Sequence, residues 1–471
     1  AAPFAPGADV ILRDGEVGGV GGRDVRIDGG RGAAVGAGLA AGAPDQDVLD
    51  GGGGALLPGL HDHHLHLRAL AATRRSVPCG APAVQRPADL DRVLREAAAR
   101  AGTGRWIRGV GHDDALGGPL DRRRLDELAP HRPARIQHRS GHLWILNSLA
   151  LDRAGPVVTA LAADGLLYDR DDLLHGLDPA RPEEEWADVA AVSAALAACG
   201  VTGLTDATAG NDAAAARDLA RWRAEGALLQ HPHLLGGEGV AGARKIVLAE
   251  HDLPGLDALV AAVSDAHDEG RPVAVHAASR ATVVLALAGL EAAGARPGDR
   301  LEHAAVAPPE LVAWAARLGV TVVTNPGFVV AHGDRYRRDV DVEDRPWLYR
   351  GRAFVDAGVP LAAGSDAPFG PLDPWRSMRA AVDRRTERGA EMGPDERLSP
   401  EAALALYTGP ATDPGGPARR VAPGAPADLC LLAVPWVEAR TALTADYVAA
   451  TFVAGALVHD GGTTGSDQEH P

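Results

Sequence analysis

Short apolar runs alternate with Ala/Leu/Arg-rich stretches through most of the chain. The apolar runs have the length of buried strands, and the stretches between them have the composition of helices. Such alternation is typical of βα units that build a parallel sheet. We expect eight strands, at residues 60–66, 201–207, 228–235, 243–248, 272–277, 300–303, 320–325 and 360–366. Eight such strands predict a (β/α)8 TIM-like barrel, an α/β fold whose active site lies where the strands end.

The two ends of the chain have a different pattern, in which short strand-like runs are separated by glycines. Residues 1–57 and 416–460 both show it, and together they predict a small β-sandwich built from both termini. The barrel would then occupy residues 58–415. Residues from about 67 to 200 do not fit the alternation, and we interpret them as a cap-like insertion after the first barrel strand. The polar tail 461–471 is predicted to be disordered.

Composition and charge exclude several classes of partner. The formal net charge is −16, and the arginines are interspersed with acidic residues, so no basic face for a nucleic acid is predicted. Cys79, Cys199 and Cys430 are far apart, which indicates neither a disulfide framework nor a cysteine zinc site. No signal peptide and no run of about 20 apolar residues is apparent. We expect a cytoplasmic protein without membrane contact that acts on a small molecule; a homo-oligomer stays open.

A cluster of histidines marks the first predicted barrel strand, in His61-Asp62-His63-His64-Leu65-His66. Because side chains alternate along a strand, Asp62, His64 and His66 share one face. Two imidazoles at this spacing can reach one metal ion, and Asp62 could orient one of them. A solvated polar patch is the alternative interpretation.

The single lysine of the chain, Lys245, stands out among 47 basic residues. A buried lysine can lose its proton, which an arginine cannot, and a neutral amine can capture carbon dioxide as a carbamate. His276, His303 and Asp366 likewise end predicted strands. Each could be an ordinary polar residue at a strand end. Together they would meet at one barrel mouth with enough ligands for two divalent ions.

At this point the chain resembles the amidohydrolase superfamily, and within it the branch that contains N-substituted formamide deformylase. The matching stretches cover nearly the whole chain. They are Pro58 to His66, Gly141-His142 with Asn147-Ser148, Gly200 to Thr202, Arg300 to Ala304, Gly364 to Asp366, and Gly424 with Ala427 to Leu429. The resemblance implies a metal-dependent (β/α)8 barrel with a β-sandwich from both termini.

The resemblance also implies a role for each candidate ligand. His64 and His66 would bind the more buried metal ion, and His276 and His303 the second ion. Lys245 would bridge the two as its carbamate. Asp366 would be both a ligand and the general acid/base for a hydroxide that bridges the metals. The expected cofactors are two divalent ions, zinc by default, with carbon dioxide for lysine carboxylation. The expected reaction is hydrolysis of a C–N bond in an amide, an N-formyl compound or a cyclic amide.

Two neighbouring positions depart from the pattern of the branch, and a histidine in the predicted cap is a further candidate for the site. Ser279 and Arg280 stand where the branch has a Gly-Asp pair, so Arg280 is a candidate for holding a substrate carboxylate; a solvent-facing helix arginine is the alternative. His142, in the predicted cap, is a candidate for polarising the substrate carbonyl, against the alternative of a packed capping histidine.

Other activities on the same fold stay open. A mononuclear deaminase usually has a glutamate three residues after the histidine of the fifth strand, where this chain has Ser279. An esterase or lactonase would use the same metals, and a non-catalytic scaffold would not need the complete ligand set. A second His-x-His, His231-Pro232-His233, is interrupted by proline, and we interpret it as a polar strand end.

Overall fold

The computed structural model describes residues 9–40, 47–100, 102, 104–168, 170–174, 176–177 and 180–461. The chain divides into two compact units. The main unit comprises Ala1–His66 and Ala190–Pro471, and the inserted unit comprises Leu67–Val189. The tail predicted to be disordered lies, apart from Gly461, outside the described residues. The domain boundaries expected from the sequence stay predictions.

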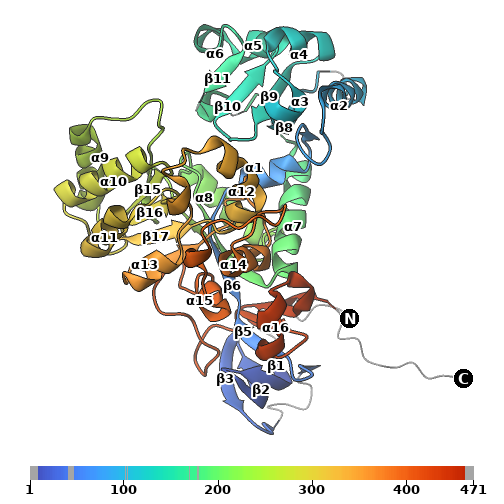
Figure 1. Cartoon of the computed structure of the whole chain (residues 1–471). Coiled ribbons are helices and arrows are strands. Elements are labelled where there is room, and N and C mark those ends of the chain that lie inside the picture. The colour runs from blue at the N-terminus through green and yellow to red at the C-terminus, as the bar shows by residue number, and fades with distance from the viewer. Residues whose placement is uncertain are drawn as a thin grey trace, which may run out of the picture. The chain divides into compact units, whose positions relative to one another are not determined.

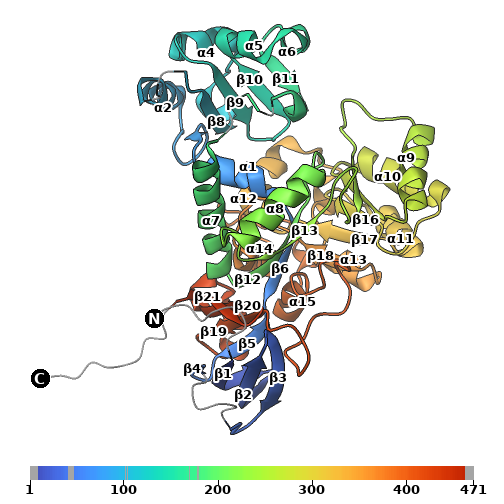
Figure 2. The same cartoon turned by 180° about the vertical axis from the view of Figure 1, so that it is seen from behind.

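In the described part of the main unit, strands of two parallel sheets occur at each of the eight predicted places (Figures 1 and 2). Three of them form a sheet in the order β13-β12-β6, and five form a sheet in the order β14-β15-β16-β17-β18. A parallel bridge between Gly236 and Arg244 connects the end of β13 to β14. The strands are β6 (Leu60–Leu65), β12 (Val201–Asp206), β13 (His231–Leu234), β14 (Arg244–Val247), β15 (Val273–Ala277), β16 (Arg300–His303), β17 (Thr321–Thr324) and β18 (Leu361–Ala363).

Helices separate these strands and bury one face each. In α9 (Leu256–Asp268) the buried positions include Leu259, Val263 and Ala266, which have helical spacing. Side-chain caps fix where several helices begin. At the start of α8, for example, the Asp212 carboxylate accepts hydrogen bonds from two backbone N–H groups of the helix. In Figure 1, α9, α10 and α11 lie beside β15 to β17. The remaining helices are α7 (Pro182–Ala198), α8 (Ala213–Ala224), α10 (Arg280–Ala293), α11 (Pro309–Leu318), α12 (Gly327–Asp339), α13 (Arg352–Asp356), α14 (Pro374–Asp383), α15 (Pro400–Ala405) and α16 (Trp436–Ala442).

Strands from both ends of the chain pair in one sheet, here called the terminal sheet. Its order is β21-β20-β19-β5-β1-β2-β3, with β4 also paired to β1. Its buried face includes Val10, Ile27, Leu429 and Phe452. The two-layer sandwich stays a prediction. The strands are β1 (Val10–Val17), β2 (Val20–Asp28), β3 (Arg31–Gly36), β4 (Asp47–Asp50), β5 (Ala55–Pro58), β19 (Leu429–Leu432), β20 (Val448–Val453) and β21 (Ala456–Asp460).

The inserted unit has its own five-stranded sheet, in the order β11-β10-β9-β8-β7, and its own apolar core around Leu90, Leu125 and Ile136. Its predicted role as a cap stays a prediction. The strands are β7 (Val77–Pro78), β8 (Ile107–His112), β9 (Ala134–His138), β10 (Leu143–Leu146) and β11 (Leu166–Tyr168), with helices α1 (Leu67–Thr73), α2 (Pro87–Arg100), α3 (Asp114–Gly117), α4 (Arg122–Leu128), α5 (Ser148–Ala154) and α6 (Pro156–Leu161).

The architecture is therefore an α/β fold with parallel sheets. None of the helices in the described part of the chain is long and apolar enough to cross a membrane.

Candidate metal centre

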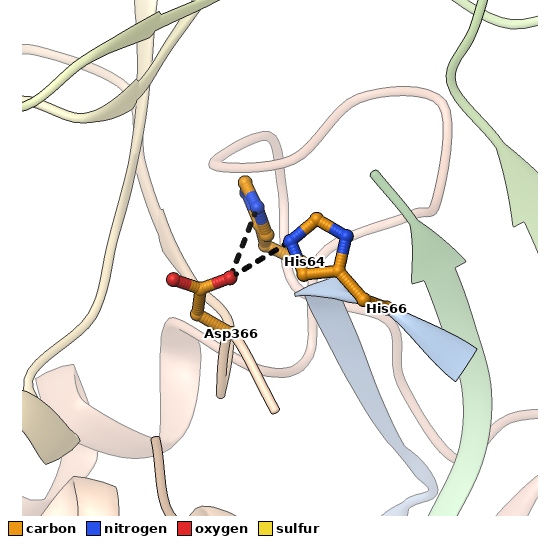
Figure 3. A group of neighbouring side chains, drawn as sticks. All are labelled: His64, His66 and Asp366. Atoms are coloured by element: carbon orange, nitrogen blue, oxygen red, sulfur yellow. Dashed lines mark ion pairs between the residues drawn. The ribbon is translucent and has the colours of Figure 1, made fainter. Parts of the chain in front are cut away.

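Three side chains converge where β6 and β18 end (Figure 3). His64 and His66 come from β6 and the residue after it, and Asp366 follows β18 by three residues. The Nε2 atom of His66 lies 3.1 Å from Asp366 Oδ1, and the Nε2 atom of His64 lies 3.5 Å from the same oxygen. One ligand atom from each residue lies within 4.8 Å of the others. Two imidazoles and a carboxylate at this spacing can hold a divalent transition metal.

The orientation of His64 is set by a buried carboxylate, Glu302. His64 Nδ1 hydrogen-bonds to Glu302 Oε2, and Arg300 Nε donates to Glu302 Oε1 at 2.5 Å. Burial raises the pKa of Glu302, but Arg300 and Lys245 hold it well below the usual value, so this carboxylate is ionised. An ionised carboxylate can only accept, so Nδ1 carries the proton and Nε2 presents its lone pair. Glu302 therefore prepares His64 as a metal ligand.

His66 is oriented by a hydroxyl in the same way. Its Nδ1 lies 2.9 Å from Thr208 Oγ1, and Nε2 points at Asp366 (Figure 3). A proton on Nδ1 donated to this hydroxyl leaves Nε2 free to bind a cation.

Asp366 is held in a backbone conformation that few residues adopt. Its φ is 53°, in the left-handed region, and its N–H donates to the carbonyl of His64 at 2.7 Å. Burial raises the pKa of Asp366, but the contacts with His66 and His64 hold it well below the usual value. Its Oδ1 atom is buried and lacks a hydrogen-bond donor among the described residues. A strained backbone that aims an ionised oxygen at two imidazoles is typical of a functional site.

Asp62 does not have the role expected from the sequence. Its Oδ1 accepts from the backbone N–H of His64 at 3.1 Å and of Ser365 at 3.0 Å. Asp62 therefore links the end of β6 to the segment after β18, and among the described residues no hydrogen bond joins it to an imidazole. Glu302 and Thr208 take that role instead.

His303 and His276 lie beside this group. The ring centroids of His64 and His303 are 4.8 Å apart, and those of His276 and His303 are 4.5 Å apart. His303 Nδ1 lies 2.7 Å from the amide oxygen of Asn325, which accepts, so its Nε2 also presents a lone pair. Burial lowers the pKa of all three imidazoles, to about 3 for His64. They are therefore neutral at pH 7, as metal ligands must be.

The single lysine is directed inward. The Nζ atom of Lys245, on β14, is buried, and no hydrogen-bond partner for it occurs in the described part of the chain. Burial lowers the pKa of Lys245, while the charges of Glu302 and Asp366 raise it. Lys245 in turn lowers the pKa values of His64 and His276. The amine thus lies within electrostatic reach of four of the other candidate ligands, namely His64, His276, His303 and Asp366.

Arg280 and His142 are placed differently from these residues. Arg280 is the first residue of α10, and its guanidinium forms an ion pair with Asp344. His142 is exposed, belongs to the inserted unit, and precedes β10 directly. Their roles toward a substrate stay predictions.

The three residues that hydrogen-bond to the candidate histidine ligands, Glu302, Thr208 and Asn325, were not predicted from the sequence. Glu302 had a signal that could have revealed it. Arg300 and Glu302 lie on the same face of a four-residue strand whose residues are all buried, and a buried charged pair in an α/β core needs a polar neighbour. Thr208 and Asn325 have common side chains at strand ends and carry no such signal.

Replacing Glu302 by Gln should weaken metal binding about 10- to 100-fold, because His64 loses the ionised acceptor that fixes its Nδ1 proton. Competition with a chromophoric chelator measures this affinity. Glu310→Gln, an exposed glutamate on α11, is the matched control and should leave the affinity unchanged. Equal affinities in both variants would contradict the orienting role of Glu302.

Aromatic side chains gather beside Asp366. The ring of Phe369 lies 5.8 Å from that of His66, edge to face. Burial is the main cause that raises the pKa values of Tyr336 and Tyr349, and the charge of Asp366 adds to the rise. Tyr336 and Tyr349 stack at 5.7 Å, and Phe328 packs edge-on against Tyr349 at 5.6 Å. The chain has five Phe and five Tyr in all, so this concentration gives the centre an apolar, aromatic border.

Comparison with known proteins places this arrangement in a family. A sequence model of the Amidohydrolase family matches residues 47–459. The chain is 27% identical to N-substituted formamide deformylase from Arthrobacter pascens, over 82% of this chain and 84% of that protein. It is 26% identical to the putative amidohydrolase YtcJ of Bacillus subtilis (strain 168), over 78% of this chain and 81% of that protein.

Solved structures agree with the fold. An uncharacterized metal-dependent hydrolase from Pyrococcus furiosus superposes with a TM-score of 0.68 at 22% identity, covering 89% of this chain and 98% of that one. A similar hydrolase from Pyrococcus horikoshii OT3 gives a TM-score of 0.70 at 20% identity, covering 89% and 96%. The family match spans the strands that carry the candidate ligands and, in the terminal sheet, β4, β5, β19, β20 and most of β21. The chain therefore belongs to the amidohydrolase family and is a metal-dependent hydrolase acting on C–N bonds other than peptide bonds.

Proposed function

We propose that the chain hydrolyses the C–N bond of an amide, an N-formyl compound or a cyclic amide at a centre of two divalent ions, zinc by default. His64 and His66 hold one ion, and His276 and His303 hold the other. Lys245, carboxylated by carbon dioxide, would bridge the two ions, and Asp366 would be a further ligand and the general acid/base. The observation that carries the proposal is the convergence of two imidazole Nε2 atoms on Asp366 Oδ1, together with a buried lysine amine that has no hydrogen-bond partner among the described residues.

The residues fit such a centre chemically. Neutral imidazoles and an ionised carboxylate are the donor set that zinc prefers. Buried polar atoms are rarely left without a hydrogen-bond partner. Among the described residues, Asp366 Oδ1 and Lys245 Nζ are buried and have no such partner. A cation satisfies the first atom. Carboxylation turns the second into an anionic oxygen ligand, and the lowered pKa of Lys245 favours the neutral amine that this reaction needs.

We also propose that the two parallel sheets are parts of one (β/α)8 barrel. The bridge between Gly236 and Arg244 joins them on one side. On the other side the N–H of Asp366, after β18, donates to His64 on β6. These contacts support closure of the two sheets into one barrel. A closed barrel would bring all six candidate ligands to the mouth where its strands end.

Metal ions bound here would lower the pKa of a water molecule and polarise the substrate carbonyl. The chain itself supplies proton transfer and orientation. Asp366 is ionised, so its carboxylate can accept the proton that the attacking water loses and can deliver it to the leaving nitrogen. The acceptor oxygens of Glu302 and Asn325 keep His64 and His303 in the tautomer that binds a cation, and the hydroxyl of Thr208 orients the ring of His66. The aromatic border around Phe369 favours substrates with an apolar or aromatic substituent.

One observation bears on the mononuclear deaminase alternative. Ser279, three residues after His276, caps α10, where its hydroxyl accepts from the N–H of Thr282 at 3.3 Å. It is a hydroxyl already engaged in a helix cap, and it cannot shuttle a proton as a carboxylate does. This favours amide hydrolysis, whereas an esterase or lactonase would use the same groups.

Metal content and substrate preference together test the proposal. Protein purified without added metal should contain about two ions per chain, and chelation should abolish amide hydrolysis reversibly. A panel of N-formyl amines, N-acyl amines, cyclic amides and esters, each with aromatic or short alkyl substituents, should give the highest kcat/KM for an aromatic amide. One ion per chain, or ester hydrolysis that exceeds amide hydrolysis, would contradict it.

A further inference from the structure

A second polar site lies near the start of β6, the strand that carries His64. A cavity of about 790 Å³, here called the basal cavity, borders the start of β6, the start of β12 and residues His231 to His233 of β13. Turns of the terminal sheet close it from the other direction, at Gly29 to Arg31, Pro426 and Ala454. His61 at its edge is three residues before His64, roughly 10 Å along the strand. The cavity is therefore separate from the metal centre.

The histidines that the metal centre does not use line the basal cavity. They are His61, from the opposite face of the first His-x-His strand, and His231 and His233 from the second His-x-His motif. His231 Nε2 contacts Asp428 Oδ1 at 3.1 Å, and His61 Nε2 contacts Thr205 Oγ1 at 2.9 Å. The ring of His233 forms no hydrogen bond with residues 9–40, 47–100 or 180–461. The second motif is thus the wall of a cavity, which is a more specific role than the polar strand end expected from the sequence.

Two arginines give the basal cavity a positive character. Arg31 donates to the carbonyl of Gly424 at 2.7 Å, and Arg419 donates to the carbonyls of Thr408 at 3.3 Å and Gly59 at 2.5 Å. Neither guanidinium forms a salt bridge within the described part of the chain. The formal charge of the chain is −16, so two arginines without an acidic partner give this cavity a local charge opposite to that of the whole protein.

The one carboxylate in the wall is already engaged. Asp428 Oδ1 accepts from His231 and also from the N–H of Ala454 at 2.8 Å. Its charge lies within electrostatic reach of Arg419 and raises the pKa of that group, which burial lowers. Arg31 therefore keeps a charge that no carboxylate in the wall neutralises, and His233 keeps a ring without a partner.

A metal ion does not fit these residues. Among the described His, Cys, Asp and Glu side chains, the group of three or more with ligand atoms within 4.8 Å is the one formed by His64, His66 and Asp366. The imidazoles of the basal cavity do not converge in that way. Guanidinium and imidazole N–H groups spread around a cavity instead match an anion with several oxygen atoms.

We propose that the basal cavity binds a small organic anion that carries carboxylate or phosphate groups. Arg31, Arg419 and His233 would contact its oxygens. Pro232, Pro410 and Ala411 supply an apolar wall for its carbon atoms. The volume is that of a small-molecule site. Such an anion would join the strands that carry the metal ligands to the terminal sheet, so its binding should stabilise the folded chain.

Calorimetric titration of the full-length protein with inorganic phosphate and with citrate, at constant ionic strength, tests the proposal. We expect saturable binding of at least one of the two, and the preferred probe distinguishes a phosphate ligand from a carboxylate ligand. Arg31→Gln and His233→Asn should each weaken binding about tenfold or more, as expected for the loss of a charged or a buried donor. Arg352→Gln is the control. Arg352 is exposed and pairs with Asp356 on α13, so this substitution removes the same charge at a place away from the basal cavity.

The metal centre is the competing binding place for phosphate, and the titration separates the two. Binding that disappears on chelation but persists in Arg31→Gln and His233→Asn would overturn the proposal, as would the absence of saturable binding. Both variants lie outside the catalytic machinery, so amide hydrolysis should be unchanged in them. Because the titration needs no substrate, its outcome is independent of the proposed function.

Discussion

Replacing Asp366 by Asn should lower kcat about 10³-fold while the chain remains folded. The amide keeps the size of the side chain but cannot accept the proton that the attacking water loses, and general acid–base catalysis typically contributes 10²- to 10⁴-fold. The amide oxygen is also a weaker ligand than a carboxylate. Steady-state kinetics on the best amide of the panel, with metal content measured on the same sample, gives the effect.

Asp356→Asn is the matched control for this variant, because Asp356 is exposed at the end of α13, where it pairs with Arg352 and is not among the candidate ligands. It should retain the activity of the unmodified chain. If Asp366→Asn keeps kcat within tenfold at full metal content, another group moves the proton and the assigned role is wrong.

Replacing Lys245 by Ala should remove about one of two bound ions per chain and lower kcat at least about 100-fold. The reason is that the carbamate is the proposed bridge, and alanine provides no oxygen for the ions to share. Elemental analysis counts the ions. Carbon-13 NMR of protein equilibrated with labelled bicarbonate detects the carbamate directly in the unmodified chain.

Two further substitutions separate the amine from its charge. Lys245→Arg keeps a positive charge but cannot be carboxylated, so it should fail as completely as alanine. Lys245→Glu supplies a carboxylate near the same place and should recover part of the metal content. Full metal content and activity in Lys245→Arg would show that carboxylation is not needed.

The parallel strands could be predicted because most of them are buried on both faces and appear as short apolar runs. β16 has the predicted bounds, Arg300–His303. β18 is shorter than predicted, because Asp366 has a positive φ that a strand cannot contain. β13 begins three residues later than the apolar run that predicted it. Periodicity thus identifies a strand, whereas local backbone conformation sets its ends.

The candidate ligands could be predicted for a similar reason. Parallel strands end at one edge of a sheet, so residues at several strand ends must lie near one another. The pairing of each ligand with the group that orients it could not be predicted, since each pair joins residues far apart along the chain. Glu302 meets His64 across 238 residues, and the partner of Arg280, Asp344, is 64 residues away. Side-chain alternation gave the correct face to Asp62 but could not show that its oxygen binds backbone N–H groups.

The position of β5 in the terminal sheet has a consequence for biosynthesis. β5 lies between β1 and β19, and Gly59 alone separates it from β6, which carries His64. The ribosome makes β19 only after nearly all the rest of the chain, so β5 waits with one edge unpaired during most of translation. Metal loading of a correctly formed centre should therefore be a late event, completed when the last strands have emerged and docked.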